Sequence, residues 1–432
     1  MNNEVPAAVA KRPDLSPARL KRRYAAERRF RLYGLVTISM AIAVLAVLLG
    51  SIIINGYSAF IQTQIAIDVD FDRSVIDPEG TKNPEVIAQA DFRALARSGV
   101  RALMPEGVGR SEERELFNVF SSGNQYELAR YVLRDPSVIG TKQRAWVKAA
   151  PEIDMLRKGY LVAAADGTSR VNKRQADFVA RLDADGRIRS RFNTTLFTAA
   201  DSREPEQAGI LGALVGSALT LLVTLVLVVP FGIAAAVYLE EFAARNRWTD
   251  LIEVNVNNLA AVPSIVFGLL GLAVLLNWFG MPRSAPLAGG TVLALMTLPT
   301  IIIAGRSALK AVPPSIREAA LAVGASPLQM VGHHVLPLAL PGMLTGTIIG
   351  MARALGESAP LLMIGMVAFI VDVPRSLTDA STVLPVQIFL WADAPERAFV
   401  EKTSAAIIVL LAFLIAMNLV AIVLRNKFEK RW

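Results

Sequence analysis

Uninterrupted runs of apolar residues alternate with polar segments along this chain. The first run covers residues 32–54, contains no charged residue and follows a basic segment, residues 1–31. Its length is close to the ~20 residues that a helix needs to cross a bilayer. A cleavable signal peptide would have a shorter apolar core of roughly 7–15 residues. We therefore expect an uncleaved transmembrane helix at 32–54.

A long polar stretch, residues 55–207, separates this run from the apolar runs of the region 208–432. It carries charges of both signs and has no apolar run long enough to span a bilayer. The sequence predicts a separate soluble domain here. The five later apolar runs lie at about 209–239, 258–279, 287–304, 340–366 and 405–424. With the first run they predict six spans, which would leave both termini on one side of the membrane.

The composition agrees with a membrane protein, since 53% of the residues are hydrophobic and 19% are charged. A purely soluble enzyme is excluded. There is no cysteine, and the two histidines are the neighbours His333 and His334. We expect these to be a packed or surface pair, and we expect no metal site. Asp68, Asp70 and Asp72 alternate, which predicts a solvated strand face rather than a cation site.

The net charge of +8 is concentrated near the N-terminus, where residues 1–31 hold nine cations and three acids. Further cations lie in the segments 240–256 and 306–334 and after the last apolar run. By the positive-inside rule these parts and both termini are cytoplasmic, and residues 55–207 are periplasmic. Nucleic-acid binding is disfavoured, because the basic segment offers only Tyr24 and Phe30 as aromatic readers.

The segment 310–337 carries the clearest local signal. Residues 315–323 predict a short helix, Gly324 a turn, and Ser326-Pro327 the capped start of a second helix. Two short helices around a glycine form a compact knob that suits insertion into a cleft of another protein. The alternative is an ordinary amphipathic loop between two spans.

This segment resembles the EAA motif of the ATP-binding-cassette (ABC) import permeases, the loop that docks onto the ATPase subunit. His334 stands where the family usually has an aliphatic residue. No G-x-x-x-x-G-K-[ST] phosphate loop occurs, so such a permease would need no cofactor and would leave ATP and Mg²⁺ to a partner ATPase. Glu318 would be a charged contact in docking, or else a solvated helix-surface carboxylate. The residues that match the motif are Glu318, Ala319, Ala320, Gly324, Leu336 and Pro337.

The segments 257–268, 298–300 and 311–317 resemble the PstA-type permeases of phosphate uptake. The resemblance implies an all-α polytopic membrane protein with the type I ABC importer permease fold, six transmembrane helices and an inserted soluble α+β periplasmic domain. It also implies the partners: a second, PstC-like permease subunit, a PstB-like ATPase dimer, a PstS-like periplasmic phosphate-binding protein, and membrane lipid. The chain itself would catalyse no covalent step.

Arg353 and Glu357 stand four residues apart, so on a helix they would share a face. An arginine within a span normally faces the bundle interior or a wet path, because its charge is costly in lipid. A guanidinium offers phosphate a bidentate donor fork, and Glu357 could neutralise it when no anion is bound. The resemblance gives both residues roles in translocation. The alternative is a structural pair that fixes two helices together.

Other functions stay open at this level. Nothing in Arg353 selects phosphorus, so the same fold could move phosphonate, sulfate or molybdate. A membrane sensor would need a cytoplasmic output domain, and the cytoplasmic segments predicted here are short. A proton-coupled carrier would not need the docking loop.

Overall fold

The computed structural model describes residues 17–163, 170–367 and 369–428. Residues 1–54 form one unit and residues 55–432 a second. The first unit is helical: α1 (Pro17–Gly56) runs without interruption through the predicted span 32–54, and no residue of its most apolar window is buried. Its helix includes the second half of the predicted basic segment, while residues 1–16 lie outside the described residues.

The polar region after α1 is built around a three-stranded antiparallel sheet in the order β2-β1-β3. The strands are β1 (Ile61–Asp70), β2 (Lys142–Lys148) and β3 (Ile188–Phe192). In the central strand β1 the side chains of Ile65, Ile67 and Val69 share one face and are buried, and Ala66 on the other face is buried as well. The register pairs Ala66 with Trp146 and Ile65 with Ile188.

Short helices cover this sheet and close its hydrophobic core. Asp91 caps α4 by accepting from the amide of Ala94, and Asn172 and Gln175 form a capping box at α8. The prediction of an α+β fold for this region is confirmed. The helical elements are η1 (Tyr57–Phe60), α2 (Arg73–Ile76), α3 (Pro84–Ala88), α4 (Phe92–Arg101), α5 (Arg110–Phe117), α6 (Asn124–Arg134), η2 (Pro136–Val138), α7 (Pro151–Arg157), α8 (Lys173–Ala184) and α9 (Thr194–Thr198).

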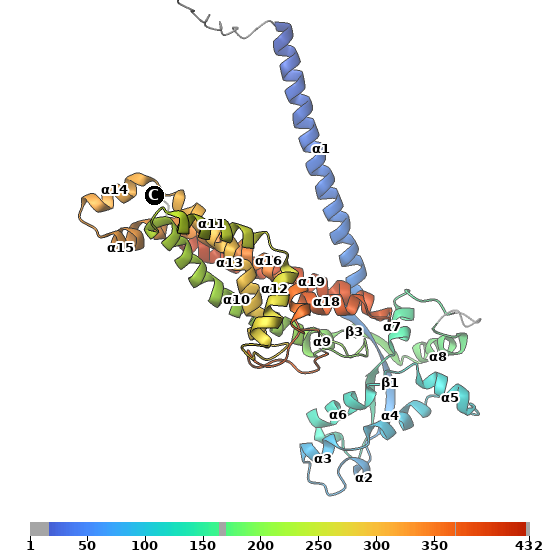
Figure 1. Cartoon of the computed structure of the whole chain (residues 1–432). Coiled ribbons are helices and arrows are strands. Elements are labelled where there is room, and N and C mark those ends of the chain that lie inside the picture. Colours follow the sequence, from blue (N-terminus) through green and yellow to red (C-terminus); the bar gives the residue numbers. More distant parts are fainter. Residues whose placement is uncertain (1–16, 164–169, 368, 429–432) are drawn as a thin grey trace, which may run out of the picture. The chain divides into compact units, whose positions relative to one another are not determined.

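The rest of the chain is a helical bundle (Figure 1). Among the described residues, five helices are long and apolar enough to cross a membrane, or six if the bent pair α11–α12 is one span. The elements are α10 (Leu211–Val237), η3 (Tyr238–Phe242), α11 (Arg247–Ala260), α12 (Ser264–Leu270), η4 (Gly271–Leu276), α13 (Pro286–Lys310), α14 (Pro314–Ala322), α15 (Pro327–Met330), η5 (Val331–Val335), α16 (Leu336–Gly356), α17 (Ala359–Met363), α18 (Leu384–Ala392) and α19 (Ala398–Phe428).

Small residues let the central helices approach closely. A Cβ on Gly342 of α16 would lie 2.7 Å from the Cβ of Ala308 on α13, and Gly346 meets Ala304 one turn further on. Helices in a bilayer associate largely through such close packing, because lipid removes the hydrophobic drive between them. Gly342 and Gly346 therefore fix the α13–α16 contact.

Two predicted spans differ from the structure. The span predicted at 258–279 has a bend near its start, where α11 and the segment from α12 to η4 meet at 105°, because Pro263 interrupts the helix. The span predicted at 340–366 is wrong at its C-terminal end, since α16 stops at Gly356 and Glu357 is extended, with φ −81° and ψ 125°. Pro360 cannot continue a helix through this point, and the chain restarts as the short α17.

Candidate functional site

The segment 310–337 folds as two short helices joined by a glycine turn, as predicted. Pro314 occupies the first turn of α14, where its missing amide costs no hydrogen bond. Gly324 has φ +90°, a left-handed conformation that other residues adopt only with strain. Ser326 and Gln329 then form a capping box at α15. Local sequence chemistry therefore shapes this knob, which Figure 1 shows at one end of the bundle.

Arg317 fastens the knob to the bundle. Its guanidinium donates to both carboxylate oxygens of Glu241 in η3, at 2.6 and 3.2 Å, and to the backbone carbonyls of Val312 (2.7 Å) and Leu309 (2.9 Å). A bidentate pair of this kind is among the stronger polar contacts in proteins. Arg317 therefore connects α14 to η3, which follows α10, and to the end of α13.

The motif residues divide between packing and exposure. Ala320 is buried against the bundle, and Leu336 and Pro337 are half-buried at the start of α16. Glu318 and Ala319 are exposed on α14, and the position of Gly324 is open to solvent. The motif thus supplies one anchoring face and one free face.

Two apolar side chains that the sequence reasoning missed lie beside that free face. Val323 is 83% exposed and Leu328 is 72% exposed. Their signal in the sequence is weak, since they stand among other apolar residues on the two sides of the turn at Gly324. Exposed apolar side chains around a charged residue suit docking to a partner protein.

Arg353 lies in the last turn of α16, and Glu357 is the first residue after that helix. Their side chains still meet, with Arg353 Nε 3.6 Å from Glu357 Oε1. The Arg353 side chain is 51% exposed, whereas Glu357 is 21% exposed. The two side chains therefore contact each other as expected. They do not share a helix face, because α16 ends at Gly356, one residue before Glu357.

The neighbours of Arg353 on α16 show which way it faces. Ala354 and Leu355 are buried in the bundle core, 1% and 4% exposed, while Arg353 projects away from it. Within the described residues its two terminal nitrogens have no recorded partner. This arrangement holds the guanidinium by one edge and leaves a donor pair that can bind an oxyanion.

A second polar cluster joins the α+β region to α19. Glu401 accepts from Ser58 Oγ (2.8 Å) and pairs with Lys158 (2.9 Å), which also pairs with Asp154 (2.6 Å). Burial alone would lower the pKa of Lys158, but these two carboxylates outweigh it and the pKa is raised. Lys402 is buried and donates to the carbonyl of Ala208 at 2.6 Å. The sequence reasoning missed Glu401 and Lys402, whose only signal is a charged pair just before an apolar run.

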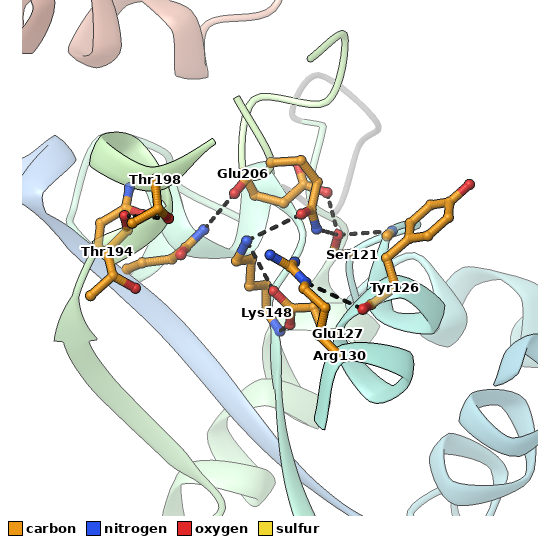
Figure 2. Close-up of polar contacts among 12 residues, drawn as sticks. Ser121, Tyr126, Glu127, Arg130, Lys148, Thr194, Thr198 and Glu206 are labelled. Carbon is orange, nitrogen blue, oxygen red and sulfur yellow. Dashed lines mark hydrogen bonds and ion pairs between the residues drawn. The ribbon is translucent and has the colours of Figure 1, made fainter. Parts of the chain in front are cut away.

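Close beside it, Ser121 Oγ donates to the carboxylate of Glu206, and Gln62 donates to the Glu206 carbonyl at 2.9 Å (Figure 2). Lys148 pairs with Glu127 at 2.9 Å and also bonds Gln207. Residues 206–208 lead directly into α10, so the α+β region is bonded to the starts of both α10 and α19.

The weaker candidates take other roles. His333 and His334 are exposed in η5. Asp68 pairs with Arg187 at 2.8 Å, and the hydrogen bond from Arg187 lowers the pKa of Asp68. Asp70 pairs with Lys142, whereas Asp72 lies beyond β1 and caps α2. In the described part of the chain, no group of three or more His, Cys, Asp or Glu side chains could hold a metal ion.

The chain is similar in sequence to known membrane components of transport systems. A family model described as the inner membrane component of binding-protein-dependent transport systems matches residues 228–432. The PstA 1 phosphate transport system permease protein of Mycobacterium tuberculosis is 32% identical over 229 residues, which cover 52% of this chain and 74% of that protein. The chain belongs to the ABC importer permease family. This permease is also 32% identical to PstA of Yersinia pestis, over 51% of its own length and 73% of that protein. Its residues 17–166 match a domain of unknown function, DUF3333.

The permease is similar to the inward-facing MetNI methionine ABC transporter, with 19% identity, a TM-score of 0.41, and coverage of 51% of this chain and 96% of that one. Family membership makes this chain a multi-pass inner-membrane component of a binding-protein-dependent ABC importer. Such permeases are not catalytic and need no cofactor, and they assemble with an ATPase subunit and a periplasmic binding protein.

Proposed function

We propose that this permease is the PstA-like subunit of a phosphate importer and forms the translocation pathway with a homologous, PstC-like subunit. The observation that carries the proposal is the half-exposed guanidinium of Arg353, held by Glu357 at the end of α16. The identity of 32% to two phosphate transport system permeases supports phosphate as the cargo.

The chemistry of the Arg353–Glu357 pair fits a permeant anion. The guanidinium offers phosphate two parallel donors, which an ammonium group does not match in geometry. Glu357 contacts the Nε edge and offsets part of the positive charge, so that phosphate binds briefly and leaves. Phosphate then crosses near Arg353, between the two permease subunits.

The segment 310–337 is the proposed docking surface for a PstB-like ATPase dimer, which binds the ATP and Mg²⁺. Glu318 supplies a charged contact, while Val323 and Leu328 supply the apolar area. Arg317 ties this surface to Glu241, so ATP-driven movement reaches α10. The spans then rock between inward-open and outward-open states.

The same proposal sets the topology. The basic segment 1–31 and the C-terminus lie in the cytoplasm, and residues 55–207 form a periplasmic domain between the first span, 32–54, and the permease core, 208–432. A PstS-like phosphate-binding protein delivers the anion on that outer side. The cations of the first segment support this orientation.

The test is uptake of labelled phosphate at micromolar concentration in cells with and without this permease, with unlabelled sulfate, phosphonate and molybdate as competitors. We expect uptake to be lost on deletion and to be competed by phosphate alone. Arg353→Ala should reduce uptake more than Arg353→Lys, which keeps the charge without the fork. The matched control is Arg283→Ala, which removes an exposed arginine from the link between η4 and α13.

Competition by another oxyanion would assign that anion as the cargo of the same importer. Uptake at the wild-type rate in membranes that contain the assembled Arg353→Ala variant would contradict the role of Arg353. Uptake that is unchanged by deletion of the whole permease would contradict phosphate as the cargo.

A further inference from the structure

The α+β region contains a pocket with a large excess of positive charge. Its volume is about 950 Å³, and it lies between the helices α4, α5 and α6 and the segment 195–207 that leads into α10. Two glutamates, Glu113 and Glu204, also line it, so the lining carries a net charge of +4. The cations of this arginine pocket are Arg93, Arg97, Arg101, Arg110, Arg114 and Arg130.

The arginines stand on helix faces that turn toward the pocket. Arg93, Arg97 and Arg101 repeat every four residues along α4, and Arg110 and Arg114 do the same along α5. Like charges at this spacing destabilise a helix, because the side chains are neighbours on one face. A fold that places such pairs on two walls of one hollow gains nothing in stability from them, which points to a ligand.

Among the described residues, most of these guanidinium groups have no carboxylate partner. Arg101 pairs with Glu113 at 2.5 Å. Arg130 donates from Nε to the carbonyl of Tyr126 at 3.3 Å, and its terminal nitrogens remain available (Figure 2). Within the described residues, Arg93, Arg97, Arg110 and Arg114 have no recorded ion pair or hydrogen bond, and all four are exposed.

Part of the pocket lining is a hydrogen-bonded polar cluster around Ser121. Ser121 donates to Glu206, accepts from the amide of Gly123 at 3.0 Å, and accepts from Gln207 at 3.2 Å (Figure 2). Gly123 leaves room for the Gln207 side chain, which a side chain at position 123 would displace. These contacts tie the lining of the pocket at Ser121 to residues 206–207, just before α10.

We propose that the arginine pocket binds a small soluble anion that carries two or more phosphate groups. Its volume lies at the upper end of the range for small-molecule pockets, about 300–1,000 Å³, so a single oxyanion would fill little of it. Several guanidinium groups from α4, α5 and α6 line this one pocket, and each can form paired hydrogen bonds with phosphoryl oxygens. A concave site of this size suits a small polyanion better than the surface of an acidic protein.

Binding is measured by calorimetry on the full-length permease in nanodiscs of zwitterionic lipid, with sodium triphosphate, pyrophosphate, phosphate and sulfate as probes at one ionic strength. We expect saturable triphosphate binding that is tighter than phosphate binding. Arg93→Gln with Arg97→Gln should weaken triphosphate binding by at least about tenfold, because each removes a charged hydrogen-bond donor. The same loss is expected for Arg110→Gln with Arg114→Gln on α5.

The control is Arg134→Gln with Arg191→Gln, which removes two exposed arginines of the same region outside the pocket. We expect this control to change binding by less than about twofold at moderate salt, where distant surface charges are screened. Thermal unfolding should show that the pocket variants are no less stable than the wild type, since they lose like-charge neighbours.

Three results would overturn the proposal: no saturable triphosphate binding, equal weakening by pocket and control variants, or binding confined to vesicles of anionic lipid or to an acidic protein. The pocket does not depend on which anion the permease transports. Phosphate uptake and triphosphate binding therefore succeed or fail separately.

Discussion

The surroundings of a single residue in this permease can move its pKa away from the value that is ordinary for that residue type. Glu206 is only 4% exposed, receives one hydrogen bond from Ser121, and has a second carboxylate oxygen without a recorded partner among the described residues. Burial raises the pKa of Glu206 above its ordinary value of 4.5. No feature of the local sequence sets Glu206 apart from exposed Glu204 two residues earlier, because only the packing of the α+β region decides which of them is covered.

Glu206→Gln is expected to show a pH-dependent gain in stability. Above the ordinary pKa of 4.5 the unfolded chain loses the proton of Glu206 before the folded chain does, so wild-type stability falls as pH rises toward the folded pKa. Glutamine does not titrate. The difference in melting temperature, variant minus wild type, should therefore grow as pH rises from 4.5 to neutral. Scanning fluorimetry in detergent measures it. Glu204→Gln is the control, and an offset for Glu206→Gln that stays constant with pH would contradict the prediction.

At the scale of elements, the loop from α14 to α15 was the most predictable part of the permease. Pro314, Gly324 and Ser326 are local signals for a helix start, a left-handed turn and a second helix start, and each acts within a few residues. The sequence did not predict which side of α14 packs on the bundle. That depends on Arg317 meeting Glu241, 76 residues away.

Val323→Asp and Leu328→Asp are each expected to weaken association with the ATPase. Both side chains are largely exposed, so a charge there costs the permease little stability but disrupts an apolar contact. Central contacts of this kind are worth about 2 kcal/mol or more, or roughly a thirtyfold loss of affinity. Copurification of the ATPase with the permease measures the effect. Val162→Asp, at a 79% exposed position of the α+β region, is the control, and full recovery of the ATPase with both loop variants would refute the docking surface.

At the scale of the second unit, the α+β region is bonded into the permease core. Lys158 and Ser58 meet Glu401 of α19, and Gln62 meets the Glu206 carbonyl just before α10. Breaking a buried ion pair leaves a charge without its partner, which is why such contacts matter more than exposed pairs. We therefore expect a conformational change of α10 or α19 to alter the α+β region. The arginine pocket adjoins these contacts, because Ser121 and Gln207 line it.

Glu401→Gln is expected to loosen this junction. The substitution keeps an acceptor for Ser58 but removes one of the two carboxylates of Lys158, and we expect a loss of about 1–3 kcal/mol, since Asp154 remains in place. Limited proteolysis should cut the α+β region of the variant faster, and its melting temperature should fall. Glu79→Gln, at an exposed position of the same region, should leave both unchanged. Equal proteolysis of the two variants would show that the junction is not a mechanical link.

Much of the architecture was readable from the sequence because the bilayer imposes a simple rule on it. Helices that cross a membrane satisfy their backbone within one segment, so length and apolarity alone predicted a spanning helix at 32–54 and a helical core at 208–432. The α+β character of residues 55–207 and the two-helix knob at 310–337 were predicted as well. Pro263 and Pro360 break the helices at 258–279 and 340–366, and both breaks were missed, although proline is itself a sequence signal.

Only the tertiary structure showed the pockets and ion pairs that residues far apart in the chain form together. The arginines of α4, α5 and α6 look like ordinary solvated helix faces in the sequence, and folding alone gathers them around one pocket. Glu401 and Lys158 are 243 residues apart, and no local pattern links them. The physical reason is the range of the forces: helix propensity, capping and hydropathy act within a few turns, whereas charge pairing and burial act between whichever segments the fold brings together.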